Sequence, residues 1–313
     1  FAPPPDSIMP ATIDVVILTE DRYTTLDAGD WYQQQIATED GLVADALRAR
    51  GLSVERRSWA DPDMHWHDTR CALFRSTWDY FDRFDAFSQW FDKAASHTRF
   101  FNDAATLRWN MDKRYLADLS AAGVAIVPTV YVDRGEAATL ADIMTTQGWP
   151  EAVFKPVVSG AARLTYRIDT ANAAAHEAIF ADCVATETMM VQAFEPAIVS
   201  SGELSLIVID GVTTHAIRKT AKAGDFRVQD DHGGTVHTHA PADDERAFAE
   251  AAARACATLP LYARVDFVRR GPGDFRLMEL ELIEPELFFR FHPPAADALA
   301  KAVVKRLACA NAA

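Results

Sequence analysis

The segment Met278–Pro285 constrains the fold of this chain more than any other, because apolar and acidic residues alternate along it with a period of two. Such alternation predicts a β-strand with one buried and one polar face. Glu279 and Glu281 then share one face, while Leu280 and Leu282 share the other. Residues two apart on a strand are about 6.6 Å apart, so two carboxylates can flank a small divalent cation. A solvated acidic face on a half-exposed strand is the alternative.

The composition allows a large core and argues against several classes of partner. Of the 313 residues, 49% are hydrophobic, which is enough for two or three domains. With 31 basic and 45 acidic residues the net charge is −14, so we expect neither nucleic acid nor an anionic membrane as a partner. No apolar run approaches the roughly 18 residues of a membrane-spanning helix.

The cysteines and the first residues predict a cytoplasmic protein. Cys71, Cys183, Cys256 and Cys309 are scattered without a CxxC pair, which is typical of free thiols in a reducing compartment. The segment Phe1–Ile8 has neither the basic start nor the apolar stretch of a signal peptide. We interpret this segment as part of a flexible tail.

Short strands alternate with helices over roughly residues 12–105, and this βαβ pattern predicts a small open parallel sheet. The expected elements are strands at Ile13–Leu18, Leu52–Trp59 and Cys71–Trp78 and helices at Glu39–Arg50 and Phe84–Ala95.

Two further units follow, each mixing strands and helices. The second is expected to contain a helix at Asn110–Ala122, strands at Ile126–Val132, Ala152–Val158 and Thr165–Ile168, and a helix at Ala171–Cys183. The third is expected to contain a strand at Met189–Phe194, hairpins of Glu203–Ile209 with Thr213–Lys219 and of Tyr262–Val268 with Phe275–Ile283, and helices at Asp243–Leu259 and Pro294–Leu307. The predicted division is a tail (1–11), an N-terminal α/β domain (12–110), a central subdomain (111–188) and a C-terminal subdomain (189–313).

Two cationic segments are candidate phosphate sites. Lys155 ends an apolar strand just before a small-residue loop with Gly160, where an ammonium and loop amides can approach phosphate oxygens. The run from Arg218 to Arg227 places four cations within ten residues of an acidic chain. A solvated strand end and a solvated charged face are the respective alternatives.

The connector Met190–Pro196 offers backbone groups to an adenine edge, and Glu195 or Glu203 could accept hydrogen bonds from ribose hydroxyls. The sequence has no Walker A loop, no GxGxxG fingerprint and no GxSxG elbow. Two His-x-His pairs lack a third ligand at a recognisable spacing, so a transition-metal site is not predicted from His65 with His67 or His237 with His239.

Taken in this order, these segments resemble the ATP-grasp superfamily, in the branch that contains bacterial glutathione synthetase and the ribosomal-protein glutamate ligase. The block 216–234 resembles the glutamate ligase in spacing and chemistry. Asp266, with Glu279 and the residue two positions further on, resembles the magnesium-ligand pattern of the superfamily. Lys113 and Lys155 match its two lysines that hold ATP phosphates.

Three segments resemble one subgroup of the superfamily more closely: Phe74–Tyr80, Arg108–Leu116 and Gly224–Gln229. The named member of this subgroup is the cycloserine synthetase, an O-ureido-D-serine cyclo-ligase. The similarity extends over roughly residues 13–309. It implies an N-terminal open parallel α/β domain followed by two ATP-grasp subdomains with ATP between them.

The resemblance implies an ATP-dependent ligase that joins a small carboxylate to an amine-type nucleophile through an acyl phosphate and releases ADP and phosphate. A ligase that adds amino acids to a polypeptide and a non-catalytic nucleotide-binding protein are the alternatives. The roles expected on this basis are catalysis by Arg218, Lys219 and Arg227; nucleotide binding by Lys113, Lys155, Gly160, Gln192, Phe194, Glu195 and Glu203; metal binding by Asp266, Glu279 and Glu281; and substrate binding by Arg75, Ser76, Thr77, Trp78, Asp79, Tyr80, Gln229 and Gly234.

The expected cofactors are ATP and Mg²⁺, with two ions in the site and Mn²⁺ as an alternative metal. Related ligases imply a homodimer or homotetramer. Two departures from the family pattern stand out. Many relatives have asparagine where Glu281 stands, which adds a negative charge to this site, and the phosphate-covering loop has only one glycine, Gly160, where relatives have several.

Overall fold

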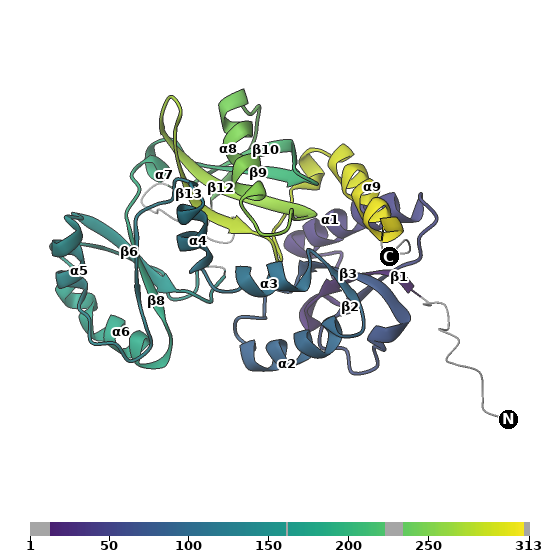
Figure 1. The fold of residues 1–313 in the computed structure, drawn as a ribbon, viewed down its shortest axis with the longest axis horizontal. Helices are drawn as coiled ribbons and strands as arrows, with labels where there is room; N and C mark the ends of the chain where they lie inside the picture. Colours follow the sequence, from purple (N-terminus) through teal and green to yellow (C-terminus); the bar gives the residue numbers. More distant parts are fainter. Residues whose placement is uncertain (1–12, 161, 223–233, 310–313) are drawn as a thin grey trace. The chain divides into compact units, whose positions relative to one another are not determined.

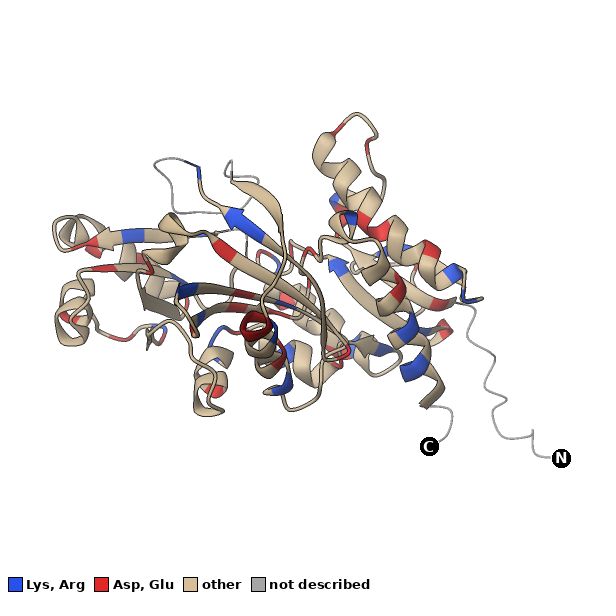
Figure 2. Ribbon diagram, turned by 90° about the horizontal axis from the view of Figure 1, so that it is seen from above, with Lys and Arg blue, Asp and Glu red and all other residues tan. Residues whose placement is uncertain are grey.

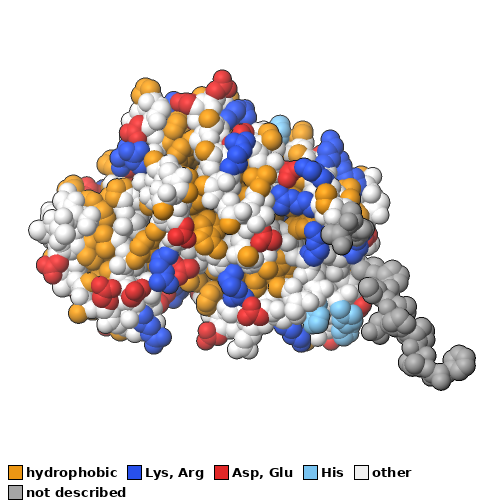
Figure 3. Space-filling model, in the orientation of Figure 1, with side chains coloured by type: hydrophobic (Ala, Val, Ile, Leu, Met, Phe, Trp, Pro, Cys, Tyr) orange, Lys and Arg blue, Asp and Glu red, His pale blue; other side chains and the backbone are white. Residues whose placement is uncertain are grey.

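A computed structural model describes residues 13–160, 162–222 and 234–309. Within them, the first compact unit comprises residues 13–105, 260–262 and 283–309, and the second comprises 106–259 and 263–282 without the undescribed positions (Figure 1). No helix of the described residues is both long enough and apolar enough to cross a bilayer. Basic and acidic segments are interspersed along the described ribbon (Figure 2), and charged and apolar atoms are mixed on the face in Figure 3.

The first unit is built on a four-stranded parallel sheet in the order β2-β1-β3-β4. The sequence predicts a parallel sheet here, but neither its strand order nor its fourth strand, β4. Parallel strands need crossover connections, which the helices provide. The strands are β1 (Ile13–Thr19), β2 (Val54–Ser58), β3 (Thr69–Ser76) and β4 (Arg99–Phe101); the helices are α1 (Trp31–Arg48), α2 (Phe84–Ala95) and α9 (Pro294–Cys309), with short turns of 3₁₀-helix at η1 (Asp21–Tyr23), η2 (Trp66–Asp68) and η4 (Phe289–Phe291).

Helix α1 begins at Trp31, well before the predicted start at Glu39. The carboxylate of Asp30 accepts hydrogen bonds from the backbone N–H groups of Tyr32 (2.8 Å) and Gln33 (3.1 Å), which caps the helix. The first turns carry glutamines and exposed aromatic rings, so they lack the apolar spacing on which the prediction relied.

The second unit begins with a four-stranded antiparallel sheet in the order β5-β8-β6-β7. Helices α5 and α6 pack on it, and Phe154, Phe180 and Met189 are fully buried between these layers. The elements are β5 (Thr129–Val132), α5 (Leu140–Gln147), β6 (Glu151–Pro156), β7 (Tyr166–Asp169), α6 (Ala173–Thr186) and β8 (Met189–Ala193).

A five-stranded sheet in the order β11-β10-β9-β12-β13 completes this unit. Helix α8 packs on one face of it, where Ala249, Phe267 and Leu280 share a buried core. Strand β11 was not predicted, and α8 ends at Arg254 rather than Leu259, a position that precedes a proline and so disfavours helix. The elements are α7 (Ala197–Ser200), β9 (Glu203–Ile209), β10 (Val212–Thr220), β11 (Thr235–His239), α8 (Asp243–Arg254), β12 (Tyr262–Gly271) and β13 (Asp274–Glu281).

The helix predicted at Asn110–Ala122 starts later, as α4 (Tyr115–Ala121), and a separate helix that was not predicted, α3 (Ala104–Asn110), precedes it. Between them the backbone N–H of Lys113 donates to the Val157 carbonyl (2.9 Å), which ties the break to the end of β6. Helical periodicity reflects only neighbouring residues, so it cannot predict a hydrogen bond to a residue far along the chain. The break turns the Lys113 side chain toward β13.

The outer edge of β13 is covered by groups from distant parts of the chain. The Asn110 amide donates to the Leu280 carbonyl (2.8 Å) and accepts from the Leu282 N–H (3.0 Å), while the Tyr115 hydroxyl accepts from the Leu280 N–H (2.9 Å). Ile126 forms a bridge with Leu277, and β5 begins only after Pro128, so the predicted strand at 126–132 is divided between two sheets. These hydrogen bonds pair backbone groups at the edge of β13 and hold its acidic face in place.

Candidate functional site

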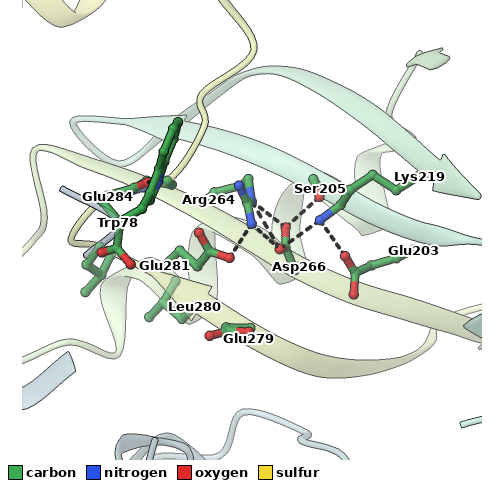
Figure 4. Close-up of polar contacts among 12 residues, drawn as sticks. Trp78, Glu203, Ser205, Lys219, Arg264, Asp266, Glu279, Leu280, Glu281 and Glu284 are labelled. Carbon is green, nitrogen blue, oxygen red and sulfur yellow. Dashed lines mark hydrogen bonds and ion pairs between the residues drawn. The ribbon is translucent and has the colours of Figure 1, made fainter. Parts of the chain in front are cut away.

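One face of the five-stranded sheet carries a cluster of charged side chains, drawn in Figure 4. Alternation along each strand brings them to this face, because the intervening residues, such as Val265 and Leu280, belong to the buried core on the other side. The cluster consists of Glu203 and Ser205 from β9, Lys219 from β10, Arg264 and Asp266 from β12, and Glu279 and Glu281 from β13.

Asp266 is the centre of this cluster and is 2% exposed. Its carboxylate accepts from the Ser205 hydroxyl (2.5 Å), from Lys219 Nζ (3.1 Å) and from Nε (3.0 Å) and Nη2 (2.9 Å) of Arg264. Burial alone would raise the pKa of Asp266, but the charges of Arg264 and Lys219 lower it to about 2. Asp266 is therefore a fixed negative charge.

Lys219 lies between two carboxylates, 2.6 Å from Glu203 and 3.1 Å from Asp266. Burial would lower the pKa of this lysine, but the two acidic neighbours raise it above its ordinary value. The adjacent Arg218 is exposed on the opposite side of β10, where its guanidinium is 3.5 Å from His239. The structure thus places one of these two predicted catalytic cations in the cluster and the other outside it.

Arg264 is a member of the cluster that the sequence interpretation missed. Its guanidinium binds both Asp266 and Glu281, with its side chain only 11% exposed. The strand register places Arg264 directly opposite Glu281, and Asp266 opposite Glu279. The sequence did contain a signal for Arg264. It lies two positions before Asp266 in a predicted strand, so the two side chains must share a face.

Glu279 meets a lysine from the break between α3 and α4. Lys113 Nζ is 2.9 Å from Glu279 Oε1 and also donates to the Ser159 carbonyl. Burial alone would raise the pKa of Glu279, but Lys113 and Lys155 lower it. The side chain of Lys155 forms no hydrogen bond or ion pair with the described residues; burial lowers its pKa, although the charge of Glu279 opposes this shift. A cation without an ion-pair partner among the described residues, beside a paired one, is suited to binding an anion.

Glu281 has a different electrostatic environment from Glu279. Burial raises its pKa to about 7; the charge of Arg264 opposes this shift, and the charges of Glu279 and Asp266 add to it. Two carboxylates of one strand face thus differ in their affinity for a proton. Glu279 is held ionised, and Glu281 takes up a proton near neutral pH.

We expect Glu281 to make the stability of the metal-free protein depend on pH. Its folded carboxyl holds a proton that the unfolded chain releases, so its stabilising effect is present below pH 4.5 and is lost as the pH rises to about 7. The free energy of unfolding should therefore fall over this range relative to the variant Glu281→Gln. Urea unfolding of both proteins in a chelating buffer tests this; a difference that does not change with pH contradicts it.

The predicted nucleotide-binding residues of β8 and its connector are all engaged by neighbours within the unit. The Gln192 amide donates to the Thr129 hydroxyl (3.0 Å), and the Arg167 guanidinium lies 3.7 Å from the centre of the Phe194 ring. Glu195 is 5% exposed and is 2.6 Å from a guanidinium nitrogen of Arg270. Glu203 belongs instead to the charged cluster.

The remaining predicted residues of the second unit lie in loops. The Gly160 carbonyl accepts from the Arg163 N–H (2.9 Å) in the turn after β6, and Gly234 immediately precedes β11. Arg227 and Gln229 lie outside the described residues. These positions do not test the roles expected of Gly160 and Gly234, which stay predictions.

The predicted substrate-wall residues follow one another at the carboxyl end of β3 in the first unit. Arg75, Ser76, Thr77 and Tyr80 are buried there, and Trp78 and Asp79 are half-buried. The Trp78 indole N–H donates to the Glu284 carbonyl (3.0 Å; Figure 4), and Asp79 accepts from the Trp59 indole N–H (2.7 Å). Ligands of open α/β sheets bind at this end of the strands.

Metal-binding chemistry is restricted in the described residues. They contain no group of three or more His, Cys, Asp or Glu side chains arranged to hold a metal ion as they stand. The carboxylates of Asp266, Glu279 and Glu281 instead bind lysine and arginine side chains. His239 of one His-x-His pair is bound to Glu245 (2.8 Å).

Two protein-family models match the chain. One, described as the N-terminal domain of D-cycloserine synthetase DcsG, matches residues 15–102. The other, described as the ATP-grasp domain of prokaryotic glutathione synthetase, matches residues 120–261.

Similar proteins cover nearly the whole chain. The cycloserine biosynthesis protein DcsG of Streptomyces lavendulae is 32% identical over 283 residues, which are 85% of this chain and 92% of that protein. The crystal structure of D-cycloserine synthetase DcsG is 28% identical, with a TM-score of 0.79, and the match covers 94% of this chain and 99% of that one. The D-alanine–D-alanine ligase of Bacillus anthracis is similar in fold, with 12% identity, a TM-score of 0.63 and coverage of 95% and 98%.

Proposed function

Because this chain belongs to the D-cycloserine synthetase family of ATP-grasp ligases, we propose that it closes a ring by forming a C–N bond within an O-ureido-serine-like molecule. The predicted family, the fold class and the assignment as an ATP-dependent ligase are confirmed by these similarities. ATP-grasp enzymes use ATP and divalent metal ions. The observation that carries the proposal is the charged cluster, which combines cations for phosphate with carboxylates for a metal on one sheet face.

The carboxylates of the cluster fit a hard divalent cation. The side chains of Glu279 and Glu281 share a face and are 27% and 26% exposed, and carboxylate oxygens are the ligands that Mg²⁺ prefers. We propose that they hold Mg²⁺ with Asp266, at one or two positions. The positive charge that these carboxylates need is provided in the structure by Lys113, Lys219 and Arg264. A bound ion would neutralise charge on the phosphate oxygens.

The chain needs no side-chain nucleophile for the proposed reaction. A carboxylate oxygen of the substrate attacks the γ-phosphorus, and the bond from this phosphorus to the ADP oxygen breaks. A nitrogen of the same substrate then attacks the acyl carbon, the bond to the phosphate oxygen breaks, and the nitrogen loses a proton. Fixed cations stabilise the charge that develops in such steps. We assign this role to Lys219 and Arg264, and binding of the ATP phosphates to Lys113 and Lys155.

An ADP-release assay tests the proposed function. The full-length protein is incubated with ATP, Mg²⁺ and, in separate reactions, O-ureido-D-serine, single amino acids or dipeptides, and product masses are recorded. We expect ADP release with a small carboxylate substrate and a product from a single substrate molecule. A ladder of masses on a polypeptide would instead identify a protein-modifying ligase. ATP binding without ADP release under every condition would contradict catalysis.

We expect Lys155→Met to separate nucleotide binding from stability. Because Lys155 is half-buried and has no ion-pair partner among the described residues, removing its charge should leave the unfolding temperature unchanged or raise it. The same change should raise the KM for ATP by about tenfold or more, because the charge-assisted hydrogen bond from the lysine to an ATP phosphate is lost. The paired Lys113→Met is the matched comparison, and it should lose both stability and ATP affinity. Equal destabilisation by the two variants would contradict the assignment.

The expected partners and location follow the same proposal. We propose small-molecule substrates, no membrane or nucleic-acid partner, and a homodimer or homotetramer in the cytoplasm. All four cysteines are free thiols and three of them are buried, which suits a reducing compartment.

A further inference from the structure

A side chain, rather than a further strand, binds the edge of β13 beside Glu281. Backbone groups alternate in direction along a strand, so those of Leu280 and Leu282 point away from β12. The amide of Asn110, the last residue of α3, donates to the Leu280 carbonyl (2.8 Å) and accepts from the Leu282 N–H (3.0 Å). This amide therefore forms the pair of hydrogen bonds that a residue of a neighbouring strand would form.

The two hydrogen bonds hold the backbone on both sides of Glu281. The Leu280 carbonyl belongs to the peptide group that precedes Glu281, and the Leu282 N–H belongs to the peptide group that follows it. Because peptide groups are planar, holding both of them sets the φ and ψ angles of Glu281. These angles fix the direction of its Cα–Cβ bond. Asn110 thus controls where the Glu281 carboxylate points without touching that carboxylate.

Glu281 lies where the strand pairing ends. It is the last residue of β13, and its pairing with Arg264 is the last pair between β12 and β13 in this direction. Arg264 binds the Glu281 carboxylate from β12 (Figure 4). Backbone at the end of a strand opens more easily than backbone in its middle. The hydrogen bonds of Asn110 counteract this opening at the position that carries the second carboxylate of the strand.

The chemistry of asparagine fits this role. The Asn110 side chain is 7% exposed, and a buried amide is costly unless its polar atoms are hydrogen-bonded. An amide offers a donor and an acceptor side by side without a charge, whereas an ionised carboxylate offers acceptors alone. Both functions of the Asn110 amide are used on the peptide groups that flank Glu281.

We propose that Asn110 is a positioning residue for metal binding, which acts on the cation through the backbone of Glu281. Mg²⁺ demands near-ideal octahedral geometry with ligands at about 2.0–2.1 Å, so a displaced carboxylate binds it less well. Groups that orient a metal ligand typically contribute about 10- to 100-fold to metal affinity. The assignment rests on the proposed function in taking Glu281 as a metal ligand.

Titration of the full-length protein with Mn²⁺, without nucleotide, tests this assignment. The paramagnetic resonance of free Mn²⁺ gives the affinity of the wild type, Asn110→Ala, Glu281→Gln and the double variant. We expect Asn110→Ala to bind Mn²⁺ about tenfold more weakly than the wild type. Because Asn110 acts through Glu281, the double variant should match Glu281→Gln within about twofold. A folded Asn110→Ala protein with wild-type affinity, or additive losses in the double variant, overturns the proposal.

Asn102→Ala is the matched control for the loss of a buried amide. Asn102 is fully buried in the first unit, where its amide donates to the Tyr262 carbonyl (2.9 Å) and accepts from the Leu261 N–H. The control variant loses the same kind of hydrogen bonds, so it should lose stability but keep the Mn²⁺ affinity of the wild type. An equal loss of affinity in both asparagine variants would show a general effect of destabilisation and would overturn the proposal.

Hydrogen exchange in the unchanged protein tests the proposal even if Asn110→Ala does not fold. Coupling between two events is reciprocal, so a bond that strengthens metal binding is itself strengthened by the metal. We expect saturating Mg²⁺ to slow exchange of the Leu282 amide by about tenfold, the factor expected for the affinity. The Leu261 amide, which Asn102 binds, should not change. Equal exchange of the Leu282 amide with and without Mg²⁺ overturns the proposal.

The proposed function and this assignment fail in different ways. Wild-type Mn²⁺ affinity in Glu281→Gln would overturn both the metal assignment of Glu281 and the role of Asn110. Weaker binding in Glu281→Gln but not in Asn110→Ala would leave the metal assignment intact and overturn the positioning role alone. The expected ranking of Mn²⁺ affinities in a protein that never releases ADP would support the positioning role and contradict the ligase.

Discussion

Replacing Glu279 by glutamine should reduce ATP-dependent ADP formation by on the order of 10³-fold while the protein remains folded. Glu279 is held ionised by Lys113 and Lys155, so it offers a full negative charge to a metal ion. Glutamine keeps the size of the side chain and can still accept from Lys113, but it removes that charge. Because the side chain is 27% exposed, the substitution creates no cavity.

The measurement for this variant has two parts. Steady-state ADP release reports the catalytic loss, and the paramagnetic resonance of added Mn²⁺ reports metal binding directly. Asp274→Asn is the matched control, because it removes a carboxylate at the start of the same strand, where the partner is Arg276. Normal turnover in Glu279→Gln would refute the metal assignment. Lost turnover with unchanged Mn²⁺ binding would show that Glu279 acts on the lysines instead.

Strand periodicity carried much of the sequence interpretation correctly. The alternation in Met278–Pro285 predicts an acidic face and a buried face, and Leu280 and Leu282 are fully buried in the structure. The same rule separates neighbours on β10, because Lys219 must face away from Arg218. The prediction grouped these two residues as one basic patch, since it counted charges along the chain rather than along a face.

Other features depended on contacts that a sequence pattern does not contain. The break that turns Lys113 toward Glu279 exists because its N–H bonds to Val157, which is far along the chain. Asn110 covers the edge of β13 with its side-chain amide, although it was expected to begin a helix. Asp30, which caps α1, was a local sign of the early start of this helix. A capping residue is a weaker indication of a helix start than an apolar stripe, on which the prediction relied.

Arg264 is the residue whose loss should have the widest effect, because it neutralises two carboxylates at once, the buried Asp266 and the half-buried Glu281. Its guanidinium binds Asp266 through two nitrogens and also binds Glu281. Breaking a buried ion pair by removing one partner costs about 3–5 kcal/mol, since an uncompensated charge remains. We expect Arg264→Met to lose stability of this order and to lose phosphoryl transfer. Urea unfolding and ADP release measure the two effects.

A second substitution distinguishes charge compensation from simple packing. In Arg264→Met the Glu281 carboxylate loses its cation, so adding Glu281→Gln should restore part of the lost stability, whereas Glu281→Gln alone removes a favourable pair. Activity should not return with it, because the cation assigned to the transferred phosphoryl group is still absent. Arg264→Lys keeps one charge but cannot bridge both carboxylates, and it should be intermediate in stability. If the two substitutions are additive, the Arg264–Glu281 pair does not stabilise the cluster, and the loss in Arg264→Met comes from the Arg264–Asp266 pair.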